Sequence, residues 1–399
     1  MILRMLSVLL LTAGLLCGPP ASRDARAGEV STLAAFPEGL RRGLDHLLQV
    51  SCPRGDRQLR SAEIGALLDA VAAGSPVALA PEAGSDAACA HGRFEIRRSL
   101  ADIVRFGYSP DIPSHLLMPS SVRVARWTEV DGQPGRPLPR LWPLVPGLRD
   151  PVVVRGIERV ENTPDPSSGA YFAYDLERAL ILLRHQGRLF LISVSIQKDV
   201  SEVGRRGAVI GADGDWNYLY FEEEGLDRPG LGWVRSHMYA GGSVSVYAQI
   251  DGARPLVRLG IFRWLKAGWA SINMVRRSHI EAGLERYADT LRRIIEHPHL
   301  PDGDTLAAGL AQIYGLSDAL LAERTRSYFQ NLADTGDARL APAVRERLDR
   351  LVADGPALHL NRDSMAALLA VQYLKALLGK PTGPEISGLD RGPDHRGRG

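Results

Sequence analysis

The sequence predicts an α+β protein built on an antiparallel sheet, with helical regions before and after the sheet in the chain. Apolar residues alternate with polar ones in several segments between residues 119 and 270, and turn signals join neighbouring segments. The apolar spacing becomes three and four before residue 74 and after residue 272, as in amphipathic helices. The 399 residues, 45% hydrophobic and 24% charged, are typical of a folded protein of two or three domains.

Residues 1–27 have the organisation of a signal peptide. A positive Arg4 precedes an apolar run from Leu6 to Leu16, and Ala25-Arg26-Ala27 places small residues where a signal peptidase reads them. We therefore expect cleavage after Ala27 and export to the periplasm or the medium. Cys17 leaves a lipoprotein as the alternative. The run is shorter than the about 20 residues that span a bilayer, so no transmembrane span is predicted.

The composition and the missing motifs restrict the function. The formal net charge is +2, which is too balanced for the basic field of most nucleic-acid binding proteins. The sequence contains no HExxH, GxSxG, Walker or paired CxxC motif. We therefore predict no nucleic-acid partner, no metal, no cofactor and no identifiable catalytic residue.

Residues 28–118 are predicted to form a helical N-terminal subdomain. Helical spacing covers residues 32–50 and 61–73, and Gly74 ends the second helix. Cys52 and Cys89 are the cysteines that remain after export without Cys17. Two cysteines in an oxidising compartment usually pair, so we predict a disulfide that stabilises this subdomain by roughly 3–4 kcal/mol.

Residues 119–300 are predicted to form the sheet and a long helix that follows it. The clearest signal is a hairpin in which ALILLRH and RLFLISVSIQ flank the turn Gln186-Gly187. A second hairpin turn is expected at Asp251-Gly252. With strands near Val122 and over residues 152–160, the count reaches six or seven, and a helix follows from Ile272 to Ile295.

The C-terminal part is predicted to be helical over residues 301–380 and disordered over residues 381–399. Asp304, Ser317 and Asn361 are suitable helix caps, and the last segment is Gly, Pro and charge. An apolar stripe at Leu368, Val371 and 374–378 would, if exposed, offer a docking surface for a protein partner.

The stretch DGDWNYLYFEEE, residues 213–224, allows two interpretations. Its carboxylates have the spacing of a calcium loop, but Tyr218 stands at the sixth position, where that loop requires Gly. Trp216, Tyr218 and Tyr220 alternate as in a strand with one aromatic face. We therefore predict a strand entered through an acidic turn. Its rings line either a pocket or an ordinary core.

The order of elements resembles the helix-grip fold of the START-like (SRPBCC) superfamily. A strand, the short helical segment PRLWPLVPGL, a run of antiparallel strands and a closing helix follow one another. The segment LGIFRWLKAGWASINMVRRSHIEAGLERYADTLRRII, from last strand to closing helix, is also similar, and the resemblance covers residues 119–297. It implies a sheet wrapped on the helix with a cavity between them, which commonly holds a lipid or another hydrophobic molecule.

These patterns predict an exported protein that binds a hydrophobic or lipid-like ligand. The expected wall consists of Tyr174, Trp216, Tyr218 and Tyr220, with Arg184 and His237 as polar contacts for a headgroup or carboxylate. Two alternatives stay open. One is a structural or interaction protein of the envelope, and the other is a hydrolase or cyclase that uses the same cavity.

Overall fold

The computed structural model describes residues 33–52, 58–80, 87–228, 232–250, 255–335 and 341–382. The predicted signal peptide, the turn at Asp251-Gly252 and residues 383–399 of the predicted tail lie outside the described residues. The described part is an α+β structure with one large antiparallel sheet and eight helices, which confirms the predicted fold class at that level.

The large sheet has nine strands, all paired antiparallel, and it begins and ends with strands that are early in the chain. The short strand β14 (Ile272–Asn273) pairs with β13 outside the main path. Along that path the strands are β1 (Ala88–Ile96), β13 (Leu256–Trp269), β12 (Ser236–Ile250), β7 (Arg188–Gln197), β6 (Ala173–His185), β4 (Val152–Asn162), β2 (Val122–Val130) and β3 (Gln133–Pro134).

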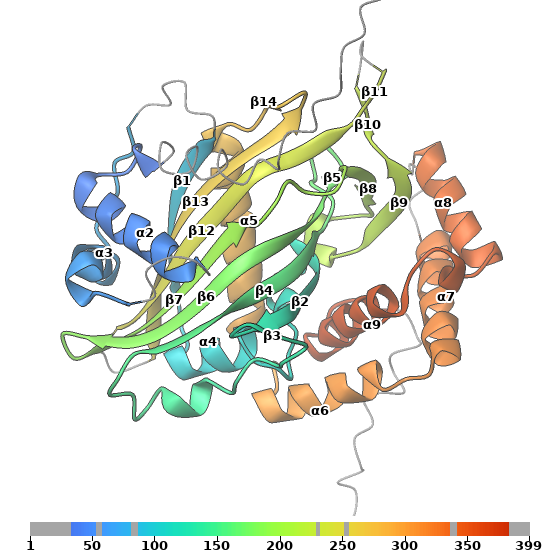
Figure 1. Cartoon of the computed structure of the whole chain (residues 1–399). Coiled ribbons are helices and arrows are strands. Elements are labelled where there is room, and N and C mark those ends of the chain that lie inside the picture. Colours follow the sequence, from blue (N-terminus) through green and yellow to red (C-terminus); the bar gives the residue numbers. More distant parts are fainter. Residues whose placement is uncertain are drawn as a thin grey trace, which may run out of the picture.

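The central strands are apolar on both faces, and each face is covered by helices. On one face Ile181, Ile192 and Phe262 pack with α2 (Glu38–Ser51) and α3 (Ser61–Ala73). On the other face Leu191 and Ile261 pack with α4 (Leu100–Gly107) and α5 (Arg277–Ile295). Figure 1 shows α2 and α3 on one side of the sheet and α5 crossing the opposite side. The sheet is therefore the middle layer of the protein.

The predicted hairpin between β6 and β7 is confirmed. Gln186 and Gly187 form the turn, with φ angles of 49° and 80°. Two successive residues with positive φ define the turn type whose twist matches that of the flanking strands. This turn fixes the register of the two strands.

The N-terminal region contains a strand that the sequence patterns missed. Residues 88–96 form β1, which pairs with β13 along its whole length, so residues 28–118 are not purely helical as predicted. The strand ACAHGRFEI has few β-branched residues, and its Gly92 leaves room for the Phe94 ring and for Leu284 of α5. Helix α4 follows, capped by Ser99 and Asp102, and then η1 (Ser114–Leu117).

The predicted disulfide is wrong in this structure. Cys52 and Cys89 both lie in the described part of the chain, and no disulfide bond joins them. Cys52 follows the last residue of α2, whereas Cys89 lies within β1 and packs in the core below α2 and α3. Both thiols are buried, where cysteine behaves as a small hydrophobic residue.

A second, three-stranded sheet joins the large sheet to the C-terminal helices. Its order is β5 (Ala170–Tyr171), β8 (Arg205–Val209) and β9 (Tyr218–Glu224). Leu219 and Phe221 of β9 pack against α7 (Asp318–Thr335) and α8 (Pro342–Ala353), while Tyr218 packs in the cluster that contains α5. The predicted strand thus begins only at Tyr218. Residues 213–215 form the 3-10 turn η3, and Trp216 is left-handed, with a φ of 56°.

The remaining elements are short or C-terminal. Asp302, rather than the predicted Asp304, caps α6, whereas Asn361 caps α9 as predicted. The Ser317 Oγ accepts a hydrogen bond from the Leu320 N–H at the start of α7, also as predicted. The elements not yet given are α6 (Gly303–Tyr314), α9 (Arg362–Leu377), η2 (Trp142–Leu144), η4 (Pro356–Leu358), β10 (Leu226–Arg228) and β11 (Gly232–Val234).

The close approach of β4 and β2 gives a test of the sheet geometry. A Cβ added at Gly156 would lie 1.9 Å from the carbonyl oxygen of Glu129. We expect Gly156→Ala to lower the free energy of unfolding by about 2–3 kcal/mol, because the backbone must move. Gly147→Ala is the control, since a Cβ there meets open space. Equal urea midpoints for the two variants would contradict this register.

Candidate functional site

The middle of the sheet carries polar side chains on the face toward α5. Paired residues of antiparallel strands project to the same face, and the register places four polar residues side by side across β6, β7, β12 and β13. The last of the four is Arg263, and Ile261, two residues before it on the same face of β13, packs in the cluster that contains α5. The four polar residues therefore lie on the face toward α5. We call these four residues the interior row: Arg178, Ser195, Ser243 and Arg263.

One end of the interior row belongs to a buried ion pair. Arg178 Nη1 lies 2.9 Å from Glu158 Oε2, and the Glu158 side chain is almost fully buried. Arg178 Nη2 also donates to Ser193 Oγ at 3.0 Å, and its guanidinium lies 5.8 Å from the centre of the Trp127 ring. These contacts offset the cost of removing two charges from water, so loss of either partner leaves a buried unpaired charge.

The rest of the interior row has unused hydrogen-bonding groups. Among the described residues, the hydroxyls of Ser195 and Ser243 make no hydrogen bond and Arg263 pairs with no carboxylate. Ser243 and Arg263 are partly exposed, although Val244 and Phe262, their neighbours on the opposite face, are 0% exposed. Solvent therefore reaches polar groups at the centre of the sheet on the α5 side.

A group of tyrosines lies on the same face of the sheet as the interior row. The hydroxyl of Tyr247 on β12 lies 3.2 Å from that of Tyr108 and 3.4 Å from that of Tyr287 on α5. Burial raises the pKa of Tyr287 and of Tyr174, and the positive charge of Arg263 opposes both increases. Tyr287 and Tyr174 therefore remain protonated at neutral pH, and the charge of Arg263 acts on both hydroxyls.

An apolar cluster borders the interior row. Val160, Tyr174 and Met238 are buried there, and Leu176 and Leu265 are partly buried against them. This group, which we call the upper apolar cluster, is separate from the larger core that includes most of α5. The α5 face of the sheet therefore changes from apolar to polar and back to apolar along its strands.

The structure brings only one of the predicted ligand-binding residues to this place. Tyr174 belongs to the upper apolar cluster, and Arg263 affects its pKa. Arg184 lies at the β6–β7 hairpin, where it donates to the carbonyl oxygens of Leu148 and Gly187. His237 lies at the opposite end of the sheet, and its Nδ1 donates to the Ser201 carbonyl oxygen at 3.2 Å. The two predicted polar contacts therefore do not share one site.

The other predicted rings are held in polar and packing contacts around β9. Trp216 and Tyr218 are buried in the core that contains α5. The Tyr218 hydroxyl donates to Asp213 Oδ1 at 2.8 Å, and Arg286 of α5 donates to both carboxylate oxygens of Asp213 at 2.5 and 2.6 Å. The acidic turn of DGDWNYLYFEEE thus anchors β9 to α5.

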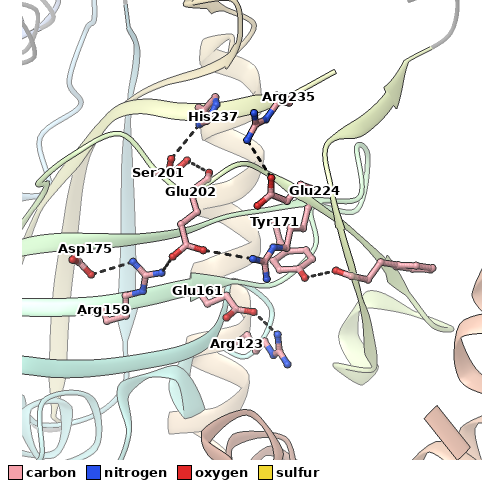
Figure 2. A network of polar contacts seen from close by, with 12 residues as sticks. Arg123, Arg159, Glu161, Tyr171, Asp175, Ser201, Glu202, Glu224, Arg235 and His237 are labelled. Carbon is pink, nitrogen blue, oxygen red and sulfur yellow. Dashed lines mark hydrogen bonds and ion pairs between the residues drawn. The ribbon is translucent and has the colours of Figure 1, made fainter. Parts of the chain in front are cut away.

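Tyr220 packs against the network of ion pairs around Arg123 and Glu161, a pair that Figure 2 shows. The Arg123 guanidinium stacks 3.8 Å from the centre of the Tyr220 ring and pairs with Glu161. Tyr171 packs edge-on against Tyr220, with ring centroids 5.2 Å apart, and donates to the Phe221 carbonyl oxygen at 2.7 Å. The aromatic face of β9 is therefore covered by arginine and tyrosine side chains.

A cleft of about 300 Å³ opens beside this network, between β2, β4, β5, β8 and the start of α9. Arg159 pairs there with Asp175 and Glu202, and Arg126 Nη1 lies 3.1 Å from Asp363 Oδ2 of α9 (Figure 2 shows the first two pairs). The charges lining the cleft are already paired with one another, so it acts as a polar junction between the sheet and α9.

Side chains of α7 and α9 hydrogen-bond to Asn217, the residue between the acidic turn and β9. Lys375 Nζ donates to Asn217 Oδ1 at 2.8 Å, and the Tyr328 hydroxyl donates to the same oxygen at 3.4 Å. Burial lowers the pKa of Lys375 to about 8. The apolar stripe predicted on α9 faces inward: Leu374 and Leu378 are buried, and Leu368 and Val371 pack against the core. This arrangement argues against the stripe as a docking surface.

The sequence patterns missed the interior row. Ser193, Ser195, Ser243 and Ser245 interrupt apolar strands at alternate positions, and this period-2 interruption was the available signal. Whether such serines face solvent or α5 depends on which face the helix covers, and strand periodicity does not contain that information.

Comparison with protein-family models, with curated proteins and with solved structures finds no match to this chain. Over the described ranges, no single helix is long and apolar enough to cross a membrane; α6 and α7 pass that test only together, with a bend of 102° between them. The same ranges contain no group of three or more His, Cys, Asp or Glu residues placed to hold a metal ion.

The buried lysine predicts a pH dependence of stability. Because the pKa of Lys375 is about 8 in the folded protein and 10.5 when exposed, the unfolded chain binds the extra proton between these values. The free energy of unfolding should therefore rise from pH 8 to pH 10 by on the order of 2 kcal/mol relative to Lys375→Met. Lys198→Met, which removes an exposed lysine, is the control. Parallel pH profiles of urea unfolding for wild type and Lys375→Met would contradict the prediction.

Proposed function

We propose that this chain is an exported protein that binds a hydrophobic or lipid-like small molecule between the large sheet and α5. The export rests on the signal-peptide pattern of residues 1–27. The binding role rests on one observation: polar and apolar side chains at the centre of the sheet, on the face toward α5, stay partly exposed. Ser243, Arg263 and Leu265 are the clearest of them.

The topology supports a helix-grip organisation for this domain. The strand β1, the helical segments α4 and η1, the antiparallel strands β2 to β13 and the helix α5 follow in that order. The opening strand is thus β1 rather than the segment near Val122, and the helical pair lies before β2. Helix α5 packs mainly on β1 and β13, so it closes one face of the sheet. In this organisation, a ligand lies between the sheet and the closing helix.

The lining fits an amphiphilic ligand. The upper apolar cluster offers Leu176, Leu265 and the Tyr174 ring, and the interior row offers hydroxyls and a guanidinium beside them. Binding sites for small molecules typically combine an apolar wall with a few polar groups that fix orientation. The buried apolar area supplies most of the binding free energy in such sites.

The enzyme alternative has less support. It rested on His237, Asp213 and Asp215 near one strand, and these residues occupy separate networks: His237 contacts the Ser201 carbonyl and Asp213 contacts Arg286. Among the described residues, no hydrogen bond joins His237 to either aspartate. General acid–base catalysis needs its groups within hydrogen-bonding reach of one substrate.

A bulky side chain at Ser243 tests the binding role. Ser243→Phe places a ring on the α5 face of the sheet, and we expect it to exclude the ligand because the space is occupied. Native mass spectrometry of protein purified from its own host should show a co-purifying small molecule with wild type. The complex should be lost or reduced at least about tenfold in Ser243→Phe.

Ser278→Phe on the exposed side of α5 is the matched control and should keep the ligand. Equal occupancy in both variants, or a wild-type protein that carries no small molecule, would contradict the proposal. Circular dichroism of both variants checks that each is folded.

A further inference from the structure

We propose that the ligand carries a terminal anionic group, a carboxylate or a phosphate monoester, and that Arg263 binds this group together with Ser243 and Ser195. This inference rests on the proposed function and specifies the chemistry of its ligand. It assigns a role to residues of the interior row that no motif identified.

The charge of Arg263 is not compensated. Three other arginines of the sheet face a carboxylate: Arg123 faces Glu161, Arg159 faces Asp175 and Glu202, and Arg178 faces Glu158. Arg263 is partly buried on β13 opposite Ser243, and among the described residues it has no such partner. A guanidinium that is withdrawn from water is stabilised by pairing with an anion. The neighbouring Glu158–Arg178 pair has no net charge, so it does not neutralise Arg263.

The hydrogen-bond donors next to Arg263 suit an anion. Ser243 is its cross-strand partner on β12, and Ser195 is the partner of Ser243 on β7. Both hydroxyls make no hydrogen bond with the described residues, so both are able to donate to an incoming oxyanion. The planar guanidinium offers two parallel N–H groups, which match the two oxygens of a carboxylate or phosphate.

The surroundings favour an amphiphile over a free inorganic anion. Leu265 lies two residues after Arg263 on the same face of β13, and Leu176 lies two residues before Arg178 on β6. Both belong to the edge of the upper apolar cluster, where an apolar chain removes their exposed surface from water. A ligand with its charge at Arg263 and its chain along these leucines satisfies both parts of the lining.

Three probes with similar alkyl chains but different headgroups separate the effect of charge from that of hydrophobicity: dodecanoate, dodecyl phosphate and 1-dodecanol. Isothermal titration calorimetry of the full chain should show at least one of the two anions binding about 10- to 100-fold tighter than the alcohol. Arg263→Met should remove this preference and leave the affinity for 1-dodecanol unchanged. Arg263→Lys should retain part of the preference because it keeps the charge without the paired N–H groups.

The control is Arg345→Met, which removes an exposed arginine on α8 and should behave as wild type. If the three probes bind equally well and Arg263→Met changes nothing, the anion site is refuted while the proposed ligand-binding function stands. If none of the probes binds to wild type, the proposed function fails, and the anion site fails with it. A preference for one anion identifies which headgroup the site accepts.

Discussion

Strands β6, β7, β12 and β13 need cover on both faces, and this requirement organises the rest of the protein. Residues such as Ile192 and Phe262 on one face, and Leu191 and Ile261 on the other, are 0–3% exposed. Burying a side chain of this size stabilises the fold by about 1.5–3 kcal/mol, so neither face can remain open. Helices α2 and α3 cover one face and α5 covers the other, although they lie more than 200 residues apart in the chain (Figure 1).

The interior row is the exception to this arrangement. Polar groups in a core usually satisfy one another, as Glu158, Arg178 and Ser193 do. Ser195, Ser243 and Arg263 have no such partners among the described residues, although they lie on the sheet face that α5 covers. Local departures from packing rules of this kind occur mainly at functional sites, because selection keeps them for binding rather than for stability.

Much of the fold followed from periodicity, and the site did not. The hairpin at Gln186-Gly187 and the helices at residues 61–73 and 277–295 were predictable from local spacing and turn chemistry. Strand β1 was not, because ACAHGRFEI has few β-branched residues and owes its conformation to pairing with β13. The predicted aromatic residues Trp216 and Tyr218 proved to be core, since rings in a core and rings in a pocket have the same sequence pattern. The interior row brings together Arg178 and Arg263, which are 85 residues apart in the chain. Local sequence patterns do not contain the strand register that aligns them.

Photo-crosslinking shows whether a ligand lies between the sheet and α5. A dodecanoate with a diazirine at the end of its chain would be irradiated with the folded protein, and the labelled residues identified by peptide mass spectrometry. A ligand in this position leads us to expect labels on the α5-facing residues of β6, β12 and β13, and on α5 itself, with loss of the labels when unmodified dodecanoate competes. Labels confined to exposed surfaces of α7 and α8, or labels that do not respond to competition, would contradict it.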